Sequence, residues 1–204
     1  MPAGLTDALA QGQALGFLGP GPLGPQMEHA LAFDPLLAGA GRVIDLGSGG
    51  GLPGLVLAAA RPGRVWVLLD ANRRRTRFLD DWVRRLGLEE TVTVLWGRAE
   101  EIGRDPEHRE MYDGAVARSF GPPAVTAECA SPFLHVGGVL VASEPPGDDR
   151  GRWPSDGLAS VGLERTGSSW APALASLRKV TETPGTVPRR VGVPVKRPLW
   201  TSGG

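Results

Sequence analysis

Between residues 42 and 145, short apolar runs alternate with stretches whose apolar side chains recur at helical spacing. The run VWVLLD (65–70) is continuously apolar up to its last residue, which is typical of a strand covered on both faces. Apolar side chains three and four residues apart in 72–88, with Gly87 near the end, predict an amphipathic helix. Four further runs predict strands, at 42–47 (RVIDLG), 91–96 (TVTVLW), 115–120 (AVARSF) and 137–144 (GGVLVASE). This alternation predicts a parallel sheet with right-handed crossovers.

The pattern changes after Pro145. Two strand-like stretches, 162–170 and 176–183, follow with no helix long enough to separate them. They predict an antiparallel hairpin at the end of a mostly parallel sheet. That combination is typical of the Rossmann-like fold of class I methyltransferases, which use S-adenosylmethionine (SAM), rather than of nucleotide-binding dehydrogenase domains. We therefore predict an α/β fold of this class.

Glycines and prolines in the segments next to these strands predict where loops lie and where helices begin or are interrupted. The stretch FLGPGPLGP (17–25) predicts a loop or lid, because proline lacks the amide that a ladder needs. Residues 26–38 predict a short amphipathic helix. A second helix is expected to begin at Pro53 and to run through LVLAAA. A third, TAECASPFL (126–134), should be interrupted near Pro132.

A chain of 204 residues has room for one domain with a full core. We expect residues 1–41 to form an N-terminal loop and helix extension, 42–183 a SAM-binding core, and 184–204 a basic, proline-rich tail. Basic and acidic residues number 22 each, so charge alone does not indicate nucleic acid. The charge is uneven, however, because every charged residue after Glu182 is basic: Arg189, Arg190, Lys196 and Arg197.

Cysteine and histidine usage indicates neither disulfides nor a metal site. Cys129 is the only cysteine and lies in an apolar helical stretch, which indicates packing. The three histidines show no metal-ligand spacing. The start of the sequence lacks the pattern of a signal peptide, and no apolar run approaches the roughly 18 residues of a membrane helix. We expect a cytoplasmic protein without a metal.

Five glycines lie within the eight residues GSGGGLPG that follow the first predicted strand. A loop so free of side chains lets a ligand lie against bare backbone. Gly49, Gly51 and Gly54 match the dinucleotide pattern G-x-G-x-x-G, whereas Asp45 with Gly47, Gly49 and Gly51 matches the methyltransferase pattern D-x-G-x-G-x-G. The glycines alone leave a pyrophosphate, SAM and a tight turn without a ligand as alternatives.

Asp45 favours SAM among these alternatives. Its carboxylate would repel a pyrophosphate in a low-dielectric cleft, but it can hold the methionyl ammonium of SAM directly or through water. Asp70 lies 25 residues further on and is placed to accept both ribose hydroxyls, a role common to both ligand classes. We therefore predict SAM as the cofactor.

Several segments together resemble the RsmG (GidB) family. They are DLGSGGGLPGLVLA, LLDANRRRTRFL, RAEEI, VARSF and the tail PRRVGVPVKRPLW, and the similarity covers roughly residues 27–145 and 187–200. The resemblance implies a SAM-dependent enzyme that methylates N7 of a guanine in the decoding region of 16S ribosomal RNA (rRNA). Its substrate would be 16S rRNA or the 30S subunit.

The resemblance also implies which residues contact the cofactor and the substrate. The residues expected at the cofactor are Asp45, Gly47, Ser48, Gly49, Gly51, Leu52, Asp70, Ala71, Ala99, Glu100 and Arg118. The basic tail residues are expected to contact RNA phosphates or the active site, with a frayed, solvated terminus as the alternative: Arg189, Arg190, Lys196 and Arg197. For Glu100 the alternative is an ordinary solvated acid at a helix start.

Arg118 is the candidate for substrate positioning, because Asp113 and Arg118 bracket the central part of the fourth predicted strand, whose C-terminal end faces the methyl group in this fold. Enzymes that methylate exocyclic amines often place an acid or amide followed by Pro-Pro-aromatic at this point, and here the sequence is Arg118-Ser119-Phe120. Guanine N7 has an in-plane lone pair and needs no general base, so orientation suffices. An arginine fork can hold O6 or a phosphate; the alternative is a structural ion pair.

Other features leave alternatives open. Phe120 is a candidate to stack on a base or to join the core. The arginines of 72–88 are expected to form a solvated face with Asp80 and Asp81. Ser143-Glu144-Pro145 replaces the family's usual Lys-Gly pair. A related enzyme acting on a small molecule or protein, and a non-catalytic SAM-binding module, therefore remain alternatives.

Overall fold

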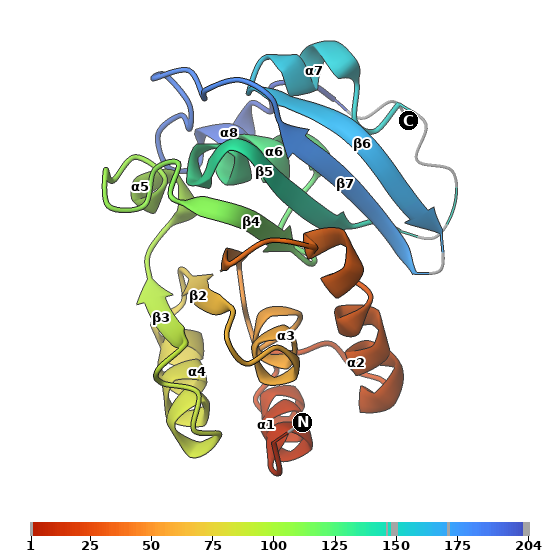
Figure 1. The fold of residues 1–204 in the computed structure, drawn as a ribbon, viewed down its shortest axis with the longest axis vertical. Coiled ribbons are helices and arrows are strands. Elements are labelled where there is room, and N and C mark those ends of the chain that lie inside the picture. The colour runs from red at the N-terminus through yellow and green to blue at the C-terminus, as the bar shows by residue number, and fades with distance from the viewer. Residues whose placement is uncertain (1, 146, 148–150, 171, 202–204) are drawn as a thin grey trace.

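The computed structural model describes residues 2–145, 147, 151–170 and 172–201. Within these residues seven strands form one sheet in the order β3-β2-β1-β4-β5-β7-β6 (Figure 1). The strands are β1 (Arg42–Leu46), β2 (Val65–Asp70), β3 (Val92–Trp96), β4 (Tyr112–Ala117), β5 (Leu134–Ser143), β6 (Leu163–Trp170) and β7 (Ala173–Lys179). Strands β1 to β5 pair in parallel, whereas β7 is antiparallel to both of its neighbours.

Helices cover both faces of the sheet (Figure 1). On one face lie α1 (Leu5–Ala14), α2 (Leu23–Leu31), α3 (Gly54–Ala60) and α4 (Arg73–Arg85). On the other lie α5 (Ala99–Ile102), α6 (Pro123–Ala130), α7 (Ser155–Ala159) and α8 (Val193–Lys196). The predicted fold class, a mostly parallel sheet that ends in an antiparallel hairpin, is confirmed.

Alternation along the strands divides the core into two layers. In β2, Trp66 and Leu68 pack into the layer under α1 to α4, and Val67 and Leu69 pack into the layer under α6 and α7. All four are at most 4% exposed. A central strand buried on both faces has to be apolar throughout, which explains the uninterrupted run VWVLLD.

The chain reverses strand order between β1 and β4, which are neighbours in the sheet although β2 and β3 come between them in sequence. In open parallel sheets, ligands bind outside the carboxyl ends of the strands at such a switch point. The ends of β1, β2 and β4 are therefore where a site is expected.

Three element predictions need correction. The stretch 17–25 is not all loop, because α2 begins at Leu23. The helix expected over 26–38 is divided between α2 and a 3₁₀ helix at Asp34–Leu37, next to the Pro35 ring. The fourth strand ends at Ala117, and Ser119 has a φ of 55°, which no extended strand permits.

Candidate cofactor and substrate site

The loop between β1 and α3 presents bare backbone at the switch point. Gly47, Gly49 and Gly51 have φ angles of 70°, 56° and 103°, which side-chain-bearing residues rarely adopt. At Gly47 the space is also closed, since a Cβ would lie 2.9 Å from Cδ2 of Phe120. The Ser48 hydroxyl donates to the backbone carbonyl of Asp45 across 3.0 Å and stiffens the turn.

Asp70 ties the end of β2 to this loop. Its Oδ2 accepts from the amide of Gly49 at 2.9 Å, and its Oδ1 accepts from the amide of Asn72 at 2.8 Å. The residue is 4% exposed, and Nη1 of Arg75 lies 3.7 Å from Oδ2. A carboxylate oxygen can accept more than one hydrogen bond, so Asp70 retains capacity for a ligand.

Asp45 lies beneath the loop and does not line a cavity. It is 1% exposed, and its Oδ2 accepts from the amide of Gly54 at 3.0 Å. Its Oδ1 is buried without a hydrogen-bond partner in the described structure. Burial raises the pKa of Asp45 to about 7. An unpartnered buried carboxylate oxygen is costly, and a cationic ligand group above the loop would offset that cost.

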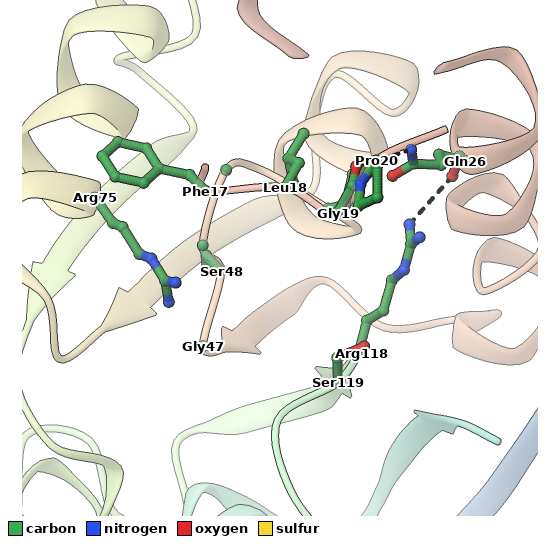
Figure 2. A pocket seen from close by; sticks show the side chains of 13 residues that line it. Phe17, Leu18, Gly19, Pro20, Gln26, Gly47, Ser48, Arg75, Arg118 and Ser119 are labelled. Atoms are coloured by element: carbon green, nitrogen blue, oxygen red, sulfur yellow. Dashed lines mark hydrogen bonds between the residues drawn. The ribbon is translucent and has the colours of Figure 1, made fainter. Parts of the chain in front are cut away.

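Two adjoining cavities lie against the loop. The first, of about 360 Å³, is lined by the glycine loop, by the segment Phe17–Pro20, and by side chains from three other elements (Figure 2): Gln26, Arg75 and Arg118. The second, of about 220 Å³, lies beyond Gly47 at the ends of β2 and β3. Gly47, Arg75 and Ser119 line both cavities, so the two are neighbours along one edge of the sheet.

Most residues expected at the cofactor meet in these cavities. The first cavity is lined by Gly47, Ser48, Gly49, Leu52 and Arg118. The second is lined by Gly47, Asp70, Ala71, Ala99 and Glu100. Asp45 and Gly51 line neither of them. The site therefore has two halves: the first cavity, which is polar and lies beside the N-terminal segment, and the second cavity, which lies between β2 and α5.

Arg118 projects across the first cavity from the end of β4 (Figure 2). It has no ion pair among the described residues; instead its Nη1 donates to the backbone carbonyl of Gln26 at 3.3 Å. Burial lowers the pKa of Arg118, and the nearby carboxyl group of Asp45 opposes that shift. The structural ion pair considered for Arg118 is therefore absent from the described structure, and several of its donors remain available.

The C-terminal tail packs against the second cavity. Gly192 donates its amide to Oε1 of Glu100 at 3.0 Å, and Val195 lines the cavity. Glu100 is 7% exposed, so the solvated acid considered for this position is wrong. Lys196 and Arg197 are exposed and line neither cavity.

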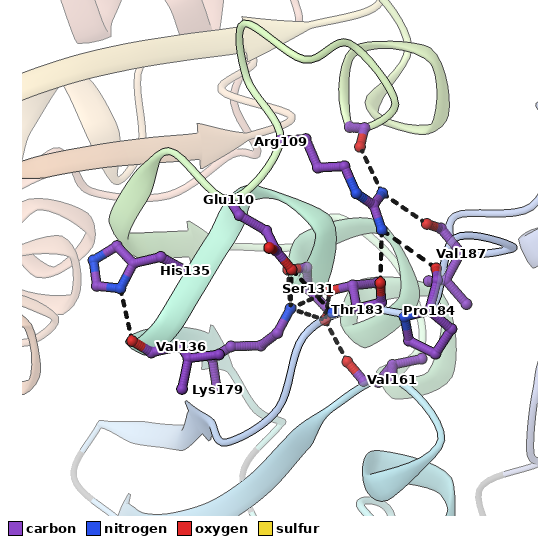
Figure 3. Close-up of polar contacts among 11 residues, drawn as sticks. Arg109, Glu110, Ser131, His135, Val136, Val161, Lys179, Thr183, Pro184 and Val187 are labelled. Atoms are coloured by element: carbon purple, nitrogen blue, oxygen red, sulfur yellow. Dashed lines mark hydrogen bonds and ion pairs between the residues drawn. The ribbon is translucent and has the colours of Figure 1, made fainter.

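Glu128 and Arg109 hold other parts of this tail. Arg189 donates through Nε and Nη2 to the fully buried Glu128 at 2.8 and 2.6 Å, so Arg189 is a structural anchor. Upstream, Arg109 donates to the carbonyls of Thr183 and Val187 at 2.8 and 2.9 Å (Figure 3). The frayed terminus considered for residues 184–200 is not what the structure describes.

A buried lysine extends this anchoring network (Figure 3). Lys179 is fully buried, donates to the carbonyl of Ser131 at 2.9 Å and to the Thr183 hydroxyl, and lies 3.5 Å from Oε1 of Glu110. Burial lowers the pKa of Lys179 to about 8. The network fixes the point at which the chain leaves β7 and enters the tail.

Several remaining candidates prove structural. Asp113 lies at the opposite edge of the sheet, where it accepts from the amides of Gly41 and Arg42 and from His135. Cys129 is 1% exposed, as expected for a packing residue, although it is among the residues that line the second cavity; burial raises the pKa of its thiol. In the described ranges, no cluster of His, Cys, Asp and Glu residues has the arrangement of a metal site, and no helix is long and apolar enough to cross a membrane.

Sequence reasoning missed four contributors to the cavities: Phe17, Gln26, Arg75 and Val195. Gln26 and Phe17 come from a segment treated only as a loop and helix extension. Arg75 was assigned to a solvated helix face, although its position five residues after Asp70 places it in the first turn of the following helix. Val195 reaches the site from the tail, in which only the basic residues were predicted to contact a ligand.

Comparison with known proteins identifies the family. Residues 27–145 match the family described as rRNA small subunit methyltransferase G (GidB). The chain is 37% identical over 169 residues to ribosomal RNA small subunit methyltransferase G of Moorella thermoacetica, covering 78% of this chain and 70% of the relative. The chain belongs to this family. The resemblance predicted over residues 27–145 is therefore confirmed.

Other comparisons agree. The corresponding methyltransferase G of Rubrobacter xylanophilus is 38% identical over 195 residues, covering 87% of this chain and 74% of the relative. Among solved structures, geranyl diphosphate methyltransferase in complex with SAM superposes with a TM-score of 0.60 at 14% identity, covering 76% of this chain and 85% of that one. At 14% identity, the likeness to this solved structure establishes the methyltransferase fold alone.

Proposed function

We propose that this chain transfers a methyl group from SAM to N7 of a guanine in 16S rRNA, in the cytoplasm, with 16S rRNA or the 30S subunit as substrate. Family membership supports the reaction class. The two adjoining cavities at the switch point of the sheet support a ligand with two chemically different halves.

The residues present fit SAM, which supplies a methyl group made electrophilic by its positively charged sulfur. We assign the nucleoside half to the second cavity, where Asp70 would accept from the ribose hydroxyls and the segment Ala99–Glu100 would flank the base. The methionyl half is assigned to the first cavity. The methionyl ammonium of SAM would then lie above the glycine loop, where it would offset the buried charge of the unpartnered Asp45 Oδ1, directly or through an intervening water.

One observation carries the choice of N7. The first cavity is lined by two arginines, Arg75 and Arg118, and among its described lining residues there is no Asp, Glu, His, Cys or Lys. Its one side-chain amide among those residues, that of Gln26, donates through Nε2 to the carbonyls of Gly19 and Gly21. An exocyclic amine has to lose a proton on methylation and needs an acceptor beside it. Guanine N7 attacks through a lone pair and loses no proton, so holding it in line is sufficient.

In this proposal Arg118 positions the guanine. Its planar fork can donate two hydrogen bonds to O6 or to a neighbouring phosphate. The bond from Nη1 to the Gln26 carbonyl fixes one side of the guanidinium and leaves the other donors for the substrate. The α2 segment would thus orient the arginine that orients the base.

The test uses methyl-labelled SAM and 30S subunits from a strain that lacks the endogenous enzyme, with the label mapped by mass spectrometry. We expect label at N7 of a single guanine in the decoding region. Absence of label, with SAM binding demonstrated in parallel by calorimetry, would contradict the proposed substrate. It would favour the alternative of a small-molecule or protein substrate.

A further inference from the structure

Helix α4 begins with a charge arrangement that opposes its own stability. Arg73, Arg74 and Arg75 occupy its first turn, Arg77 follows, and the first turn contains no acidic residue. The N-terminal end of a helix carries the positive end of the macrodipole, so cations in the first turn are unfavourable. Helix stability therefore does not explain this run of arginines.

The arginines are not neutralised by the acids expected to pair with them. Asp80 and Asp81 both pair with Arg84. In the described part of the chain, Arg73, Arg74, Arg77 and Arg85 make no ion pair, and all four are exposed: the salt bridges of α4 involve only Arg75 and Arg84. A chain of zero net charge thus presents a local excess of positive charge on this helix.

Aromatic rings accompany these guanidinium groups. The Cζ atom of Arg73 lies 3.8 Å from the ring centroid of Trp96, which is 50% exposed at the end of β3. Arg74 lies 5.8 Å from the ring of Phe17, and Arg85 lies 5.0 Å from that of Trp82. Exposed aromatic rings beside arginines form flat, cationic surfaces on which unpaired nucleobases stack.

This surface leads to the first cavity. A groove of about 300 Å³ between α1 and α4 is lined by three arginines, by aromatic rings and by one acid, Asp81, which pairs with Arg84. The arginines and the rings named above are Arg74, Arg77, Arg85, Phe17 and Trp82. Phe17 also lines the first cavity, where it lies beside Arg75 and across from Arg118 (Figure 2). The groove and the first cavity thus share Phe17 as a lining residue.

We propose that the arginine face of α4, defined as Arg73, Arg74, Arg77 and Arg85 with Trp96 and Phe17, binds an unpaired segment of the RNA that carries the target guanine. The inference rests on the proposed function and assigns a substrate-binding surface to it. The arginines contact backbone phosphates, and the rings stack on bases that are splayed out next to the target.

The test is a salt titration of RNA binding with charge-matched variants. Arg74→Ala/Arg77→Ala removes two cations of the arginine face, neither of which lines the two cavities of the cofactor site. Arg104→Ala/Arg178→Ala removes two exposed arginines outside α4 and serves as the control. Affinity for 30S subunits and for protein-free 16S rRNA is measured at several salt concentrations, and affinity for SAM is measured in parallel.

We expect the α4 variant to bind RNA about 10- to 100-fold more weakly near 0.1 M salt and to flatten the slope of log K against log salt by about 1–2, since each lost phosphate contact removes roughly 0.7–0.9. The control and the SAM affinity should change less than about 2-fold. Trp96→Leu should weaken binding about 10-fold without changing the slope, because stacking releases no counterions.

The outcomes separate this inference from the proposed function. If the wild type labels a guanine but the α4 variant matches its control in affinity and slope, the arginine face is overturned and the function stands. If the wild type neither binds RNA nor transfers a methyl group, both are overturned. Weaker binding to 30S subunits with unchanged binding to protein-free rRNA would assign the face to a ribosomal protein, which also overturns the inference.

Discussion

The amide of Gly192 donates to the carboxylate of Glu100 across 3.0 Å and joins two segments that are 92 residues apart in sequence. Glu100 lies in α5 next to Ala99, and both line the second cavity. Gly192 caps α8, from which Val195 reaches the same cavity. One hydrogen bond therefore couples the C-terminal tail to the proposed nucleoside half of the site.

Glu100→Ala should weaken SAM binding through this coupling. Loss of the acceptor leaves the Gly192 amide without its partner, which costs about 1–3 kcal/mol, and part of that cost should appear as roughly 10-fold weaker SAM binding in calorimetry. Glu100→Gln keeps an oxygen acceptor and should restore most of the affinity. The exposed neighbour provides the control: Glu101→Ala should change affinity less than 2-fold.

Glu128→Ala should destabilise the fold itself. Glu128 is fully buried and accepts from the amide, Nε and Nη2 of Arg189. Removing Glu128 leaves the Arg189 amide and guanidinium without their acceptor, at a cost of about 1–3 kcal/mol, because the Arg189 side chain is 27% exposed and water can solvate part of its charge. Urea unfolding measures this cost, and Arg190→Ala is the control because Arg190 is exposed beside the pair. Equal stability of the two variants would contradict the anchoring role.

The regular part of the fold could be predicted from the sequence because burial dictates it. The run VWVLLD has to be apolar on both faces, and Phe78 and Leu79 of α4 are buried at the spacing that predicted the helix. The end of β4 was extended by three residues because Phe120 continues an apolar pattern. Ser119 breaks the strand with its positive φ, and no local pattern signals that.

The site was predictable where backbone conformation required glycine and where an acid ended a strand. Gly47, Gly49 and Asp70 lie together as the spacing implied. The contribution of Phe17 and Val195 depends on how the two ends of the chain pack onto the same edge of the sheet. Arg189 was assigned to RNA because a basic residue near a terminus gives no sign of a buried partner 61 residues away.

Asp70→Ala should abolish SAM binding. The side chain holds the Gly49 and Asn72 amides, so its removal loosens the glycine loop and also deletes the proposed acceptor for the ribose hydroxyls. We expect at least about 100-fold weaker binding in calorimetry, since bonds from hydroxyls to a carboxylate contribute about 1.5–3 kcal/mol each. Near-native affinity in a folded variant would contradict the assignment of the second cavity.

SAM affinity should also depend on pH through Asp45. Burial raises the pKa of Asp45 to about 7, above the ordinary value near 4. Between about pH 4 and pH 7 the folded protein holds a proton on Asp45 that the unfolded chain has lost, so the stability of the ligand-free protein falls as the pH rises through this interval. Only the ionised carboxylate can balance a ligand ammonium, so affinity should increase up to about 10-fold between pH 6 and pH 8. Asp45→Asn should remove this increase, and an unchanged profile would argue against the role of Asp45.

Arg118→Ala should impair methyl transfer while leaving SAM binding nearly intact. The guanidinium crosses the first cavity and makes no ion pair in the described structure. It donates a hydrogen bond to the Gln26 carbonyl, so its remaining donors are available to the base. A misplaced nucleophile costs on the order of 100-fold in rate, so single-turnover transfer to 30S subunits should slow by about that factor. Arg118→Lys should restore little, because an ammonium cannot form the planar fork. The control for net charge is Arg104→Ala, which removes an exposed arginine outside both cavities. If SAM affinity falls in both Arg118 variants, Arg118 binds the cofactor instead of the guanine.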